Sequence, residues 1–220
     1  MNEPDTTLLS EFVHLAAETG GERLARQLGF IVEIEKMKSI LRRTLLADSS
    51  RRENDAEHSW HLAIAALLLC EYTPAPAPAI NILKTLKMTL VHDLVEIYAG
   101  DTFAYDAAGN ADKAARERES ADRLFSRLPD EQGAEIRSLW EEFDAESTIE
   151  AKYAASLDRF MPLLNNFLSQ GYAWKSGAVD SAAVYRRMDV IRTGLPALWP
   201  VVEGIIRLSV EKGFLNLENS

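Results

Sequence analysis

Residues 90–101 read LVHDLVEIYAGD, and in them a histidine and an aspartate follow one another inside an apolar stretch. Apolar side chains occupy most sides of the helix expected over Met88–Ile97, so we expect His92 and Asp93 to be at least partly buried. Gly100 marks the end of this helix. A buried carboxylate costs free energy unless a cation or hydrogen-bond donors meet it, so the pair requires a partner.

Two distant residues are predicted to point at the same interior. In the helix expected over residues 57–72, His58 shares a face with apolar residues four, seven, eight and eleven positions further on. Asp158 lies among apolar residues in the helix expected over residues 148–169, where an ionised carboxylate is costly without a cation. Two imidazoles and two carboxylates in one small domain form a donor set suited to a first-row divalent metal.

Each of these residues, taken singly, also fits a purely structural role. Many buried histidines are satisfied by a backbone carbonyl, and a salt bridge to Arg159 or Arg186 would equally account for Asp158. His14 or His61 offers a replacement for one of the four ligands. From the residues alone, two interpretations therefore stay open: a metal site, or separate structural roles for the four residues.

Two further acids accompany the His-Asp pair. Glu96 follows His92 by four residues and Asp93 by three, which places it on the same side of the helix and within reach of a metal site. Asp101 comes directly after the end of the helix, where the helix dipole disfavours an acid. A simple turn residue before Thr102 is the alternative for Asp101.

Helix-forming residues dominate the rest of the chain. Ala, Leu, Glu, Arg and Lys are abundant, alternating runs of Val, Ile and Thr are few, and no Asn-Gly or Asp-Gly pair marks a hairpin. Apolar residues recur at helical spacing. Helices are expected over residues 6–19, 30–43, 57–72, 78–99, 111–127, 130–143, 148–169, 182–192 and 196–212, with loops over 47–56 and 101–109. The fold class predicted is all-α.

One domain is expected to span residues 1–220. The chain shows no internal repeat and no long linker, and 220 residues suffice for one sizeable core. The stretch Thr73–Ala79 carries three prolines at every second position and is interpreted as a connection between two packed helices. Pro78 is expected in the first turn of the second of these helices.

The charge balance excludes one class of partner. Against 34 Asp and Glu the chain has 24 Lys and Arg, and the net charge of -10 has the wrong sign for holding a nucleic-acid polymer along a broad surface. A small anionic substrate fits if a metal or a few arginines supply local positive charge. Cys70 is the one cysteine, so neither an internal disulfide nor a cysteine-based metal site is expected. We expect no membrane span, no signal peptide and a cytoplasmic location.

The ordered motifs resemble the HD-domain metal-dependent phosphohydrolases, and among them the 5′-deoxynucleotidase subgroup. The resemblance is strongest over residues 30–208 and is carried by Glu57-His58-Ser59, by residues 90–101, by Leu139–Phe143 and by Glu150–Tyr153 leading into Leu157-Asp158. It implies a single-domain helical bundle of HD type. It also implies a homodimer, for which the apolar residues of Ala197–Leu208 would form an interface unless they close the core.

The resemblance also assigns roles to residues. One divalent metal ion is implied, and the set does not select among Mn, Co, Fe, Zn and Mg. The implied ligands are His58, His92, Asp93 and Asp158. Glu96 and Asp101 match the two acids that support the attacking water and the substrate, and are the expected catalytic residues.

Three further residues are expected to bind substrate. Arg43, fifteen residues before His58, matches a basic residue that meets the phosphate, and Arg51 and Thr102 are the other expected contacts. Guanidinium groups bind phosphate oxygens in a bidentate way. Without the resemblance, a solvated basic face formed by Arg42, Arg43, Arg51 and Arg52 is the simpler interpretation of this segment.

The expected reaction is hydrolysis of a nucleoside 5′-monophosphate to nucleoside and phosphate. In bacterial members of the family an aromatic residue directly after the matching arginine helps to exclude a ribose 2′-hydroxyl, whereas this chain has Thr44. The resemblance therefore does not extend to a choice between deoxyribose and ribose. Two alternatives remain, namely hydrolysis of another small phosphate ester and a non-catalytic helical protein that retains the metal for ligand binding or regulation.

Overall fold

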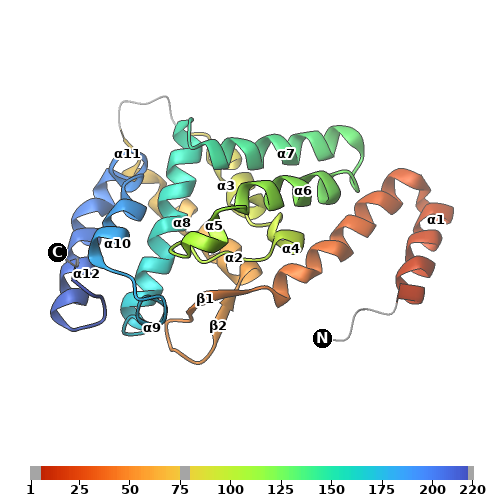
Figure 1. The fold of residues 1–220 in the computed structure, drawn as a ribbon. Coiled ribbons are helices and arrows are strands. Elements are labelled where there is room, and N and C mark those ends of the chain that lie inside the picture. Colours follow the sequence, from red (N-terminus) through yellow and green to blue (C-terminus); the bar gives the residue numbers. More distant parts are fainter. Residues whose placement is uncertain (1–5, 75–79, 218–220) are drawn as a thin grey trace.

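The computed structural model describes residues 6–74 and 80–217, and most of this part of the chain is helical (Figure 1). The prediction of an all-α fold class is confirmed. The longer helices are α1 (Thr6–Glu33), α2 (Asp55–Leu69), α3 (Ile82–Val91), α6 (Lys113–Phe125), α7 (Asp130–Ala145), α8 (Ile149–Leu168), α10 (Ser181–Met188) and α12 (Trp199–Glu211). Shorter helices are η1 (Ile34–Ser39), η2 (Cys70–Tyr72), α4 (Glu96–Ala99), α5 (Ala107–Asn110), α9 (Tyr172–Ser176), α11 (Ile191–Gly194) and η3 (Pro196–Leu198). In the described ranges, no helix is long and apolar enough to cross a membrane.

Helix α8 runs through the middle of the molecule and contacts α2, α3, α7, α11 and α12 (Figure 1). The Thr148 hydroxyl caps its start by accepting a hydrogen bond from the amide of Ala151. Ala154, Leu157 and Met161 are buried, as a helix packed on several sides requires. Asp158 is buried among them. The central position of α8 therefore carries a carboxylate into the interior.

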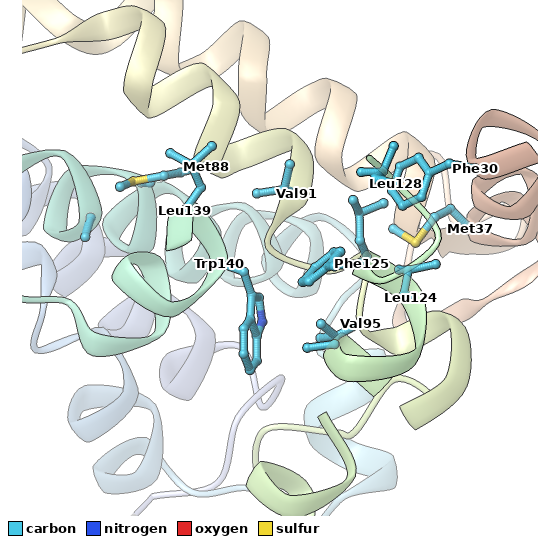
Figure 2. Packing of buried hydrophobic residues seen from close by; sticks show 14 residues of the cluster. Phe30, Met37, Met88, Val91, Val95, Leu124, Phe125, Leu128, Leu139 and Trp140 are labelled. Atoms are coloured by element: carbon cyan, nitrogen blue, oxygen red, sulfur yellow. The ribbon is translucent and has the colours of Figure 1, made fainter. Parts of the chain in front are cut away.

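Buried apolar side chains form three clusters around α8. The largest joins η1, α3, α6 and α7, and Figure 2 shows its labelled members, among them Met88, Leu124, Phe125 and Trp140. A second cluster lies between α8 and the C-terminal helices α10, α11 and α12, and a third joins α2 to α8. Val202, Ile205 and Ile206 of α12 belong to the second cluster, so the apolar face of the last helix closes the core of its own chain.

The prediction of one helix over residues 30–43 is wrong. Helix α1 continues to Glu33, η1 follows, and β1 (Leu41–Leu45) pairs antiparallel with β2 (Arg52–Asn54). The apolar spacing of this segment fits a helix only up to Ser39. Beyond it, pairing with a strand about ten residues away determines the backbone, and local periodicity does not reveal such pairing. The turn of the hairpin is formed by the Asp48 side chain, which accepts a hydrogen bond from the Ser50 amide at 3.0 Å.

Several predicted helix boundaries also shift. Helix α2 begins at Asp55, two residues before the expected start, because Asn54 and Glu57 form a capping box. The helix expected up to residue 99 is interrupted: α3 ends at Val91, and residues 92–95 form turns before α4. The helix expected over residues 6–19 does not end there: α1 continues to Glu33 and only bends at Gly21, where φ is 82°. Pro78 lies outside the described residues. The single-domain interpretation stays a prediction.

Candidate active site

The four side chains predicted as metal ligands come together where α2, the turns after α3, and α8 meet. His58 Nε2 lies 3.1 Å from Asp158 Oδ1. His92 Nε2 lies 3.1 Å from Asp93 Oδ2 and 3.6 Å from Asp158 Oδ1. All four residues are buried. Three segments that are distant in sequence thus deliver two imidazoles and two carboxylates to one point.

The hydrogen bonds of His92 fit a metal ligand. His92 Nδ1 lies 3.0 Å from the carbonyl oxygen of Thr89, and only a protonated Nδ1 can donate to it. In the neutral ring Nε2 then carries a lone pair, and this buried atom has no hydrogen-bond partner among the described residues. Donor atoms of His58, His92 and Asp93 all lie within 4.8 Å of one another. The donors and their orientation therefore fit a divalent cation.

The electrostatics of the cluster also favour a bound cation. Burial opposes a charge on His92, but Asp93 and Asp158 outweigh it and raise the pKa of the imidazole to about 10. For Asp158, burial is outweighed by the hydrogen bond from His58 and by the nearby positive charges of Arg159 and His92, and its pKa lies well below the usual range. The position strongly attracts positive charge, which a proton or a metal ion can supply.

A second cluster of acids lies beside the first. Carboxylate oxygens of Asp55, Glu96 and Asp101 lie within 4.8 Å of one another. Burial, together with the charge of Asp93, raises the pKa of Asp55 to about 7 and that of Glu96 well above its usual value. Buried oxygens of Asp55 and Glu96 have no hydrogen-bond partner within the described part of the chain. These acids therefore keep a proton more readily than exposed carboxyl groups do, and Asp55 exchanges its proton near neutral pH.

Arg42 links the two clusters. From β1 its Nη1 atom lies 2.7 Å from Asp93 Oδ2 and 3.4 Å from Asp55 Oδ1. Neither Arg42 nor Asp55 was predicted from the sequence to belong to the site. The available signal for Asp55 was the Asn54–Glu57 capping box, which places it in the first turn of α2, where acids are favourable. The inward direction of Arg42 follows from the strand, which the helical spacing of this segment did not predict.

A cavity of about 210 Å³ opens over both clusters. The acids Asp93, Glu96, Asp101 and Asp158 line it together with His92. Further walls are aromatic and basic, formed by Phe103, Tyr105, Trp140, Phe143, Trp174, Arg159 and Arg187. A mostly enclosed space with aromatic walls and a few convergent polar groups is typical of small-molecule sites.

The residues expected to bind substrate divide into two groups. Arg43 and Thr102 line the cavity, and the Arg43 guanidinium lies 5.8 Å from the centre of the Phe103 ring. Arg51 does not lie there: it belongs to the hairpin turn, and its Nη1 atom donates to Glu57 Oε2 at 2.8 Å. Thr44, the residue after Arg43, is buried at the cavity wall. The structure therefore brings Arg43 and Thr102 to the candidate site and leaves Arg51 outside it.

A helical bundle in which one histidine, a His-Asp pair and a distant aspartate meet beneath a cavity has the fold and site of an HD-domain protein. Residues 34–199 match the HD domain family, and the chain belongs to this family. The resemblance seen in the motifs is thereby confirmed.

Proteins similar to this chain include one with a closely related structure. A crystal structure from Magnetospirillum magnetotacticum, described as a predicted metal-dependent phosphohydrolase, is 47% identical, has a TM-score of 0.84 and covers 90% of this chain and 98% of its own. A protein from Pyrococcus horikoshii, 23% identical with a TM-score of 0.58 over 82% of this chain and 99% of its own, shares the fold.

Among curated proteins, the human 5′-deoxynucleotidase HDDC2 is 28% identical over 109 residues, which is 50% of each chain. The chain thus spans about half the length of the curated relatives it matches.

Proposed function

We propose that this protein is a metal-dependent phosphohydrolase that releases phosphate from nucleoside or deoxynucleoside 5′-monophosphates. The observation that carries the proposal is the buried cluster of His58, His92, Asp93 and Asp158 at a cavity that also contains Arg43. The names of two relatives support it, since one is described as a predicted metal-dependent phosphohydrolase and the other as a 5′-deoxynucleotidase.

One divalent ion, Mn, Co, Fe, Zn or Mg, is the proposed cofactor, and its proposed ligands are His58, His92, Asp93 and Asp158. When bound, it supplies Lewis acidity towards a phosphoryl oxygen and lowers the pKa of water. The Nδ1 bond from His92 to the carbonyl of Thr89 fixes the imidazole so that Nε2 faces the carboxylates.

Glu96 and Asp101 are the proposed catalytic acids and bases. Oxygen of water forms a bond to phosphorus while the bond from phosphorus to the 5′-oxygen breaks. Glu96 orients the water and accepts its proton, and Asp101 donates a proton to the departing 5′-oxygen. The three neighbouring carboxylates support the presence of both an acid and a base, because like charges so close together cannot all ionise and one of them keeps a proton.

Arg43 and Thr102 are the proposed contacts to the substrate. The Arg43 guanidinium offsets the negative charge on the phosphate, and phosphoryl transfer depends mainly on such positioning and charge stabilisation. Thr102 already accepts a hydrogen bond from Arg116 at 3.1 Å, which holds its hydroxyl at the wall. The Phe143 and Trp174 side chains offer apolar surface for the nucleoside.

We also propose a cytoplasmic location and a homodimer. The single cysteine supports the first, because the chain relies on no disulfide. Exposed apolar side chains support the homodimer. They lie on α2 and α3, and not on the apolar face of α12, which is buried in the core. Trp60, Leu68 and Leu83 are each more than half exposed.

The direct test is phosphate release from a panel of nucleoside mono-, di- and triphosphates with Mn²⁺ or Co²⁺. We expect release from the monophosphates and none after chelation. Asp93→Asn should lose bound metal and activity together, whereas Asp130→Asn, which removes an exposed carboxylate far from the site, should lose neither. If no substrate of the panel yields metal-dependent phosphate, the proposal fails and a non-catalytic metal-binding role gains support.

A further inference from the structure

Arg187 reaches the cavity from α10. Val184 and Met188 of this helix are buried and hold one of its faces against the core. Arg187 follows Val184 by three residues and is half-buried beside that face, so it lines the cavity wall. Its neighbour Arg186 is exposed and lines two surface depressions outside this cavity. Two consecutive arginines are therefore in different surroundings.

The Arg187 guanidinium makes one long ion pair within the described residues and no hydrogen bond. Its Nη2 atom lies 3.9 Å from Asp158 Oδ2, but that oxygen already accepts a hydrogen bond from Arg159 at 2.5 Å. Arg159 in turn binds Glu146 at 2.5 Å. Within residues 6–74 and 80–217, Arg187 makes no hydrogen bond. Five N–H donors of a half-buried guanidinium thus remain available for a ligand.

The charge at this position also favours an anion. Arg187 carries a positive charge at neutral pH, as arginine side chains do, and the neighbouring Arg159 carries another. Two guanidinium groups side by side in a poorly hydrated wall repel each other. An anion placed against Arg187 relieves this repulsion and takes up the unused donors.

We propose that Arg187 is a second phosphate-binding arginine of the active site, which contacts the scissile phosphate from α10 while Arg43 contacts it from β1. This inference rests on the proposed function. The assignment to the phosphate follows from position, because Arg187 adjoins Asp158, one of the proposed metal ligands. A group bound at the metal is within reach of Arg187.

The test compares two adjacent arginines. Arg187→Ala should raise KM for the nucleotide about tenfold or more, with a smaller change in kcat, because a charged hydrogen-bonded contact is lost. The inhibition constant of inorganic phosphate should rise by a similar factor. Arg187→Lys should restore part of the affinity, since lysine keeps the charge without the planar fork. Arg186→Ala removes the same charge outside the cavity and should change neither constant.

A second readout does not depend on turnover. Inorganic phosphate titrated into manganese-loaded protein in a calorimeter should bind about tenfold more weakly to Arg187→Ala than to the wild type, with equal manganese content in both. Equal phosphate affinity and equal KM overturn the role of Arg187 and leave the proposed function intact. Loss of manganese from the variant also overturns it, because Arg187 would then support Asp158. A wild type that binds phosphate through Arg187 without hydrolysing nucleotides overturns the proposed function alone.

Discussion

The Nη1 atom of Arg42 lies 2.7 Å from Oδ2 of Asp93, so a guanidinium from β1 meets a carboxylate from the turn after α3 inside the protein. The same atom lies 3.4 Å from Asp55. One side chain thus offsets negative charge in both acidic groups of the site. The two-stranded hairpin, small beside the helices, is the element that makes this contact.

Arg42→Met is expected to destabilise the protein strongly when metal has been removed with a chelator. The change leaves buried carboxylates without their cation, which typically costs about 3 to 5 kcal/mol. For a chain of this size the midpoint of thermal unfolding should fall by roughly 6 to 20 °C. Added Mn²⁺ should recover part of the loss, because a bound cation stabilises the folded state. Differential scanning calorimetry with and without chelator measures both effects.

Arg137→Met is the matched control for this substitution. Arg137 bonds the exposed carboxylates of Asp122 and Glu141, and surface ion pairs of this kind contribute about 1 kcal/mol or less. A chelated Arg42→Met protein that unfolds at the same temperature as Arg137→Met would show that Arg42 does not hold the acidic clusters together.

Helical spacing was sufficient to predict that His58 and Asp158 turn inward. His58 and Asp158 lie on apolar faces of long helices, where three- and four-residue offsets decide which side chains share a face. Their burial followed from the local pattern alone. That they lie 3.1 Å apart depends on how α2 packs on α8, which the resemblance to HD-domain proteins supplied.

The hairpin could not be predicted from local pattern. Residues 41–45 have no preference strong enough to reveal a strand, and their backbone is determined by pairing Leu41 with Asn54 and Leu45 with Arg52. Because that pairing was missed, the direction of Arg42 was missed as well. The turns at residues 92–95 escaped prediction for a related reason, since a buried apolar run looks the same whether the helix continues or bends.

Acid should remove a specific contribution to stability at Glu33, the last residue of α1. Burial of Glu33 raises its pKa, but hydrogen bonds from Lys36 and Tyr98 outweigh burial and hold the pKa below the ordinary value of 4.5. The unfolded chain therefore binds this proton more readily than the folded one. The contribution is fully present above about pH 4.5 and is lost as pH falls through the lower, folded-state pKa.

Glu33→Gln isolates that contribution. We expect the variant to unfold at a lower temperature than the wild type at pH 7, and the difference to shrink as the pH is lowered below 4.5. Thermal unfolding followed by circular dichroism over this pH range provides the measurement. Glu135→Gln, in which an exposed carboxylate bound to Lys87 is removed, serves as control. A difference that stays constant with pH would contradict the assignment to Glu33.

Gly194→Ala should destabilise the contact between α11 and α8. A β-carbon at this position would lie 2.2 Å from the carbonyl oxygen of Lys152 and 2.3 Å from the Ser156 hydroxyl, so the two helices would have to separate. Such overpacking typically costs about 1 to 3 kcal/mol, or roughly 2 to 12 °C in the midpoint of unfolding. Because Ser156 precedes Asp158 by two residues, the shift of α8 should also reduce manganese binding.

Gly204→Ala tests whether the close packing around Gly194 causes this destabilisation. Gly204 lies within α12 with no atom within 4 Å of an added β-carbon, so alanine should stabilise that helix by about 0.5 to 1 kcal/mol. The same chemical change is thus expected to lower the unfolding temperature at Gly194 and to raise it at Gly204, with manganese binding altered only by the first. Equal shifts at the two positions would show that backbone entropy, and not the close approach of α11 to α8, decides the outcome.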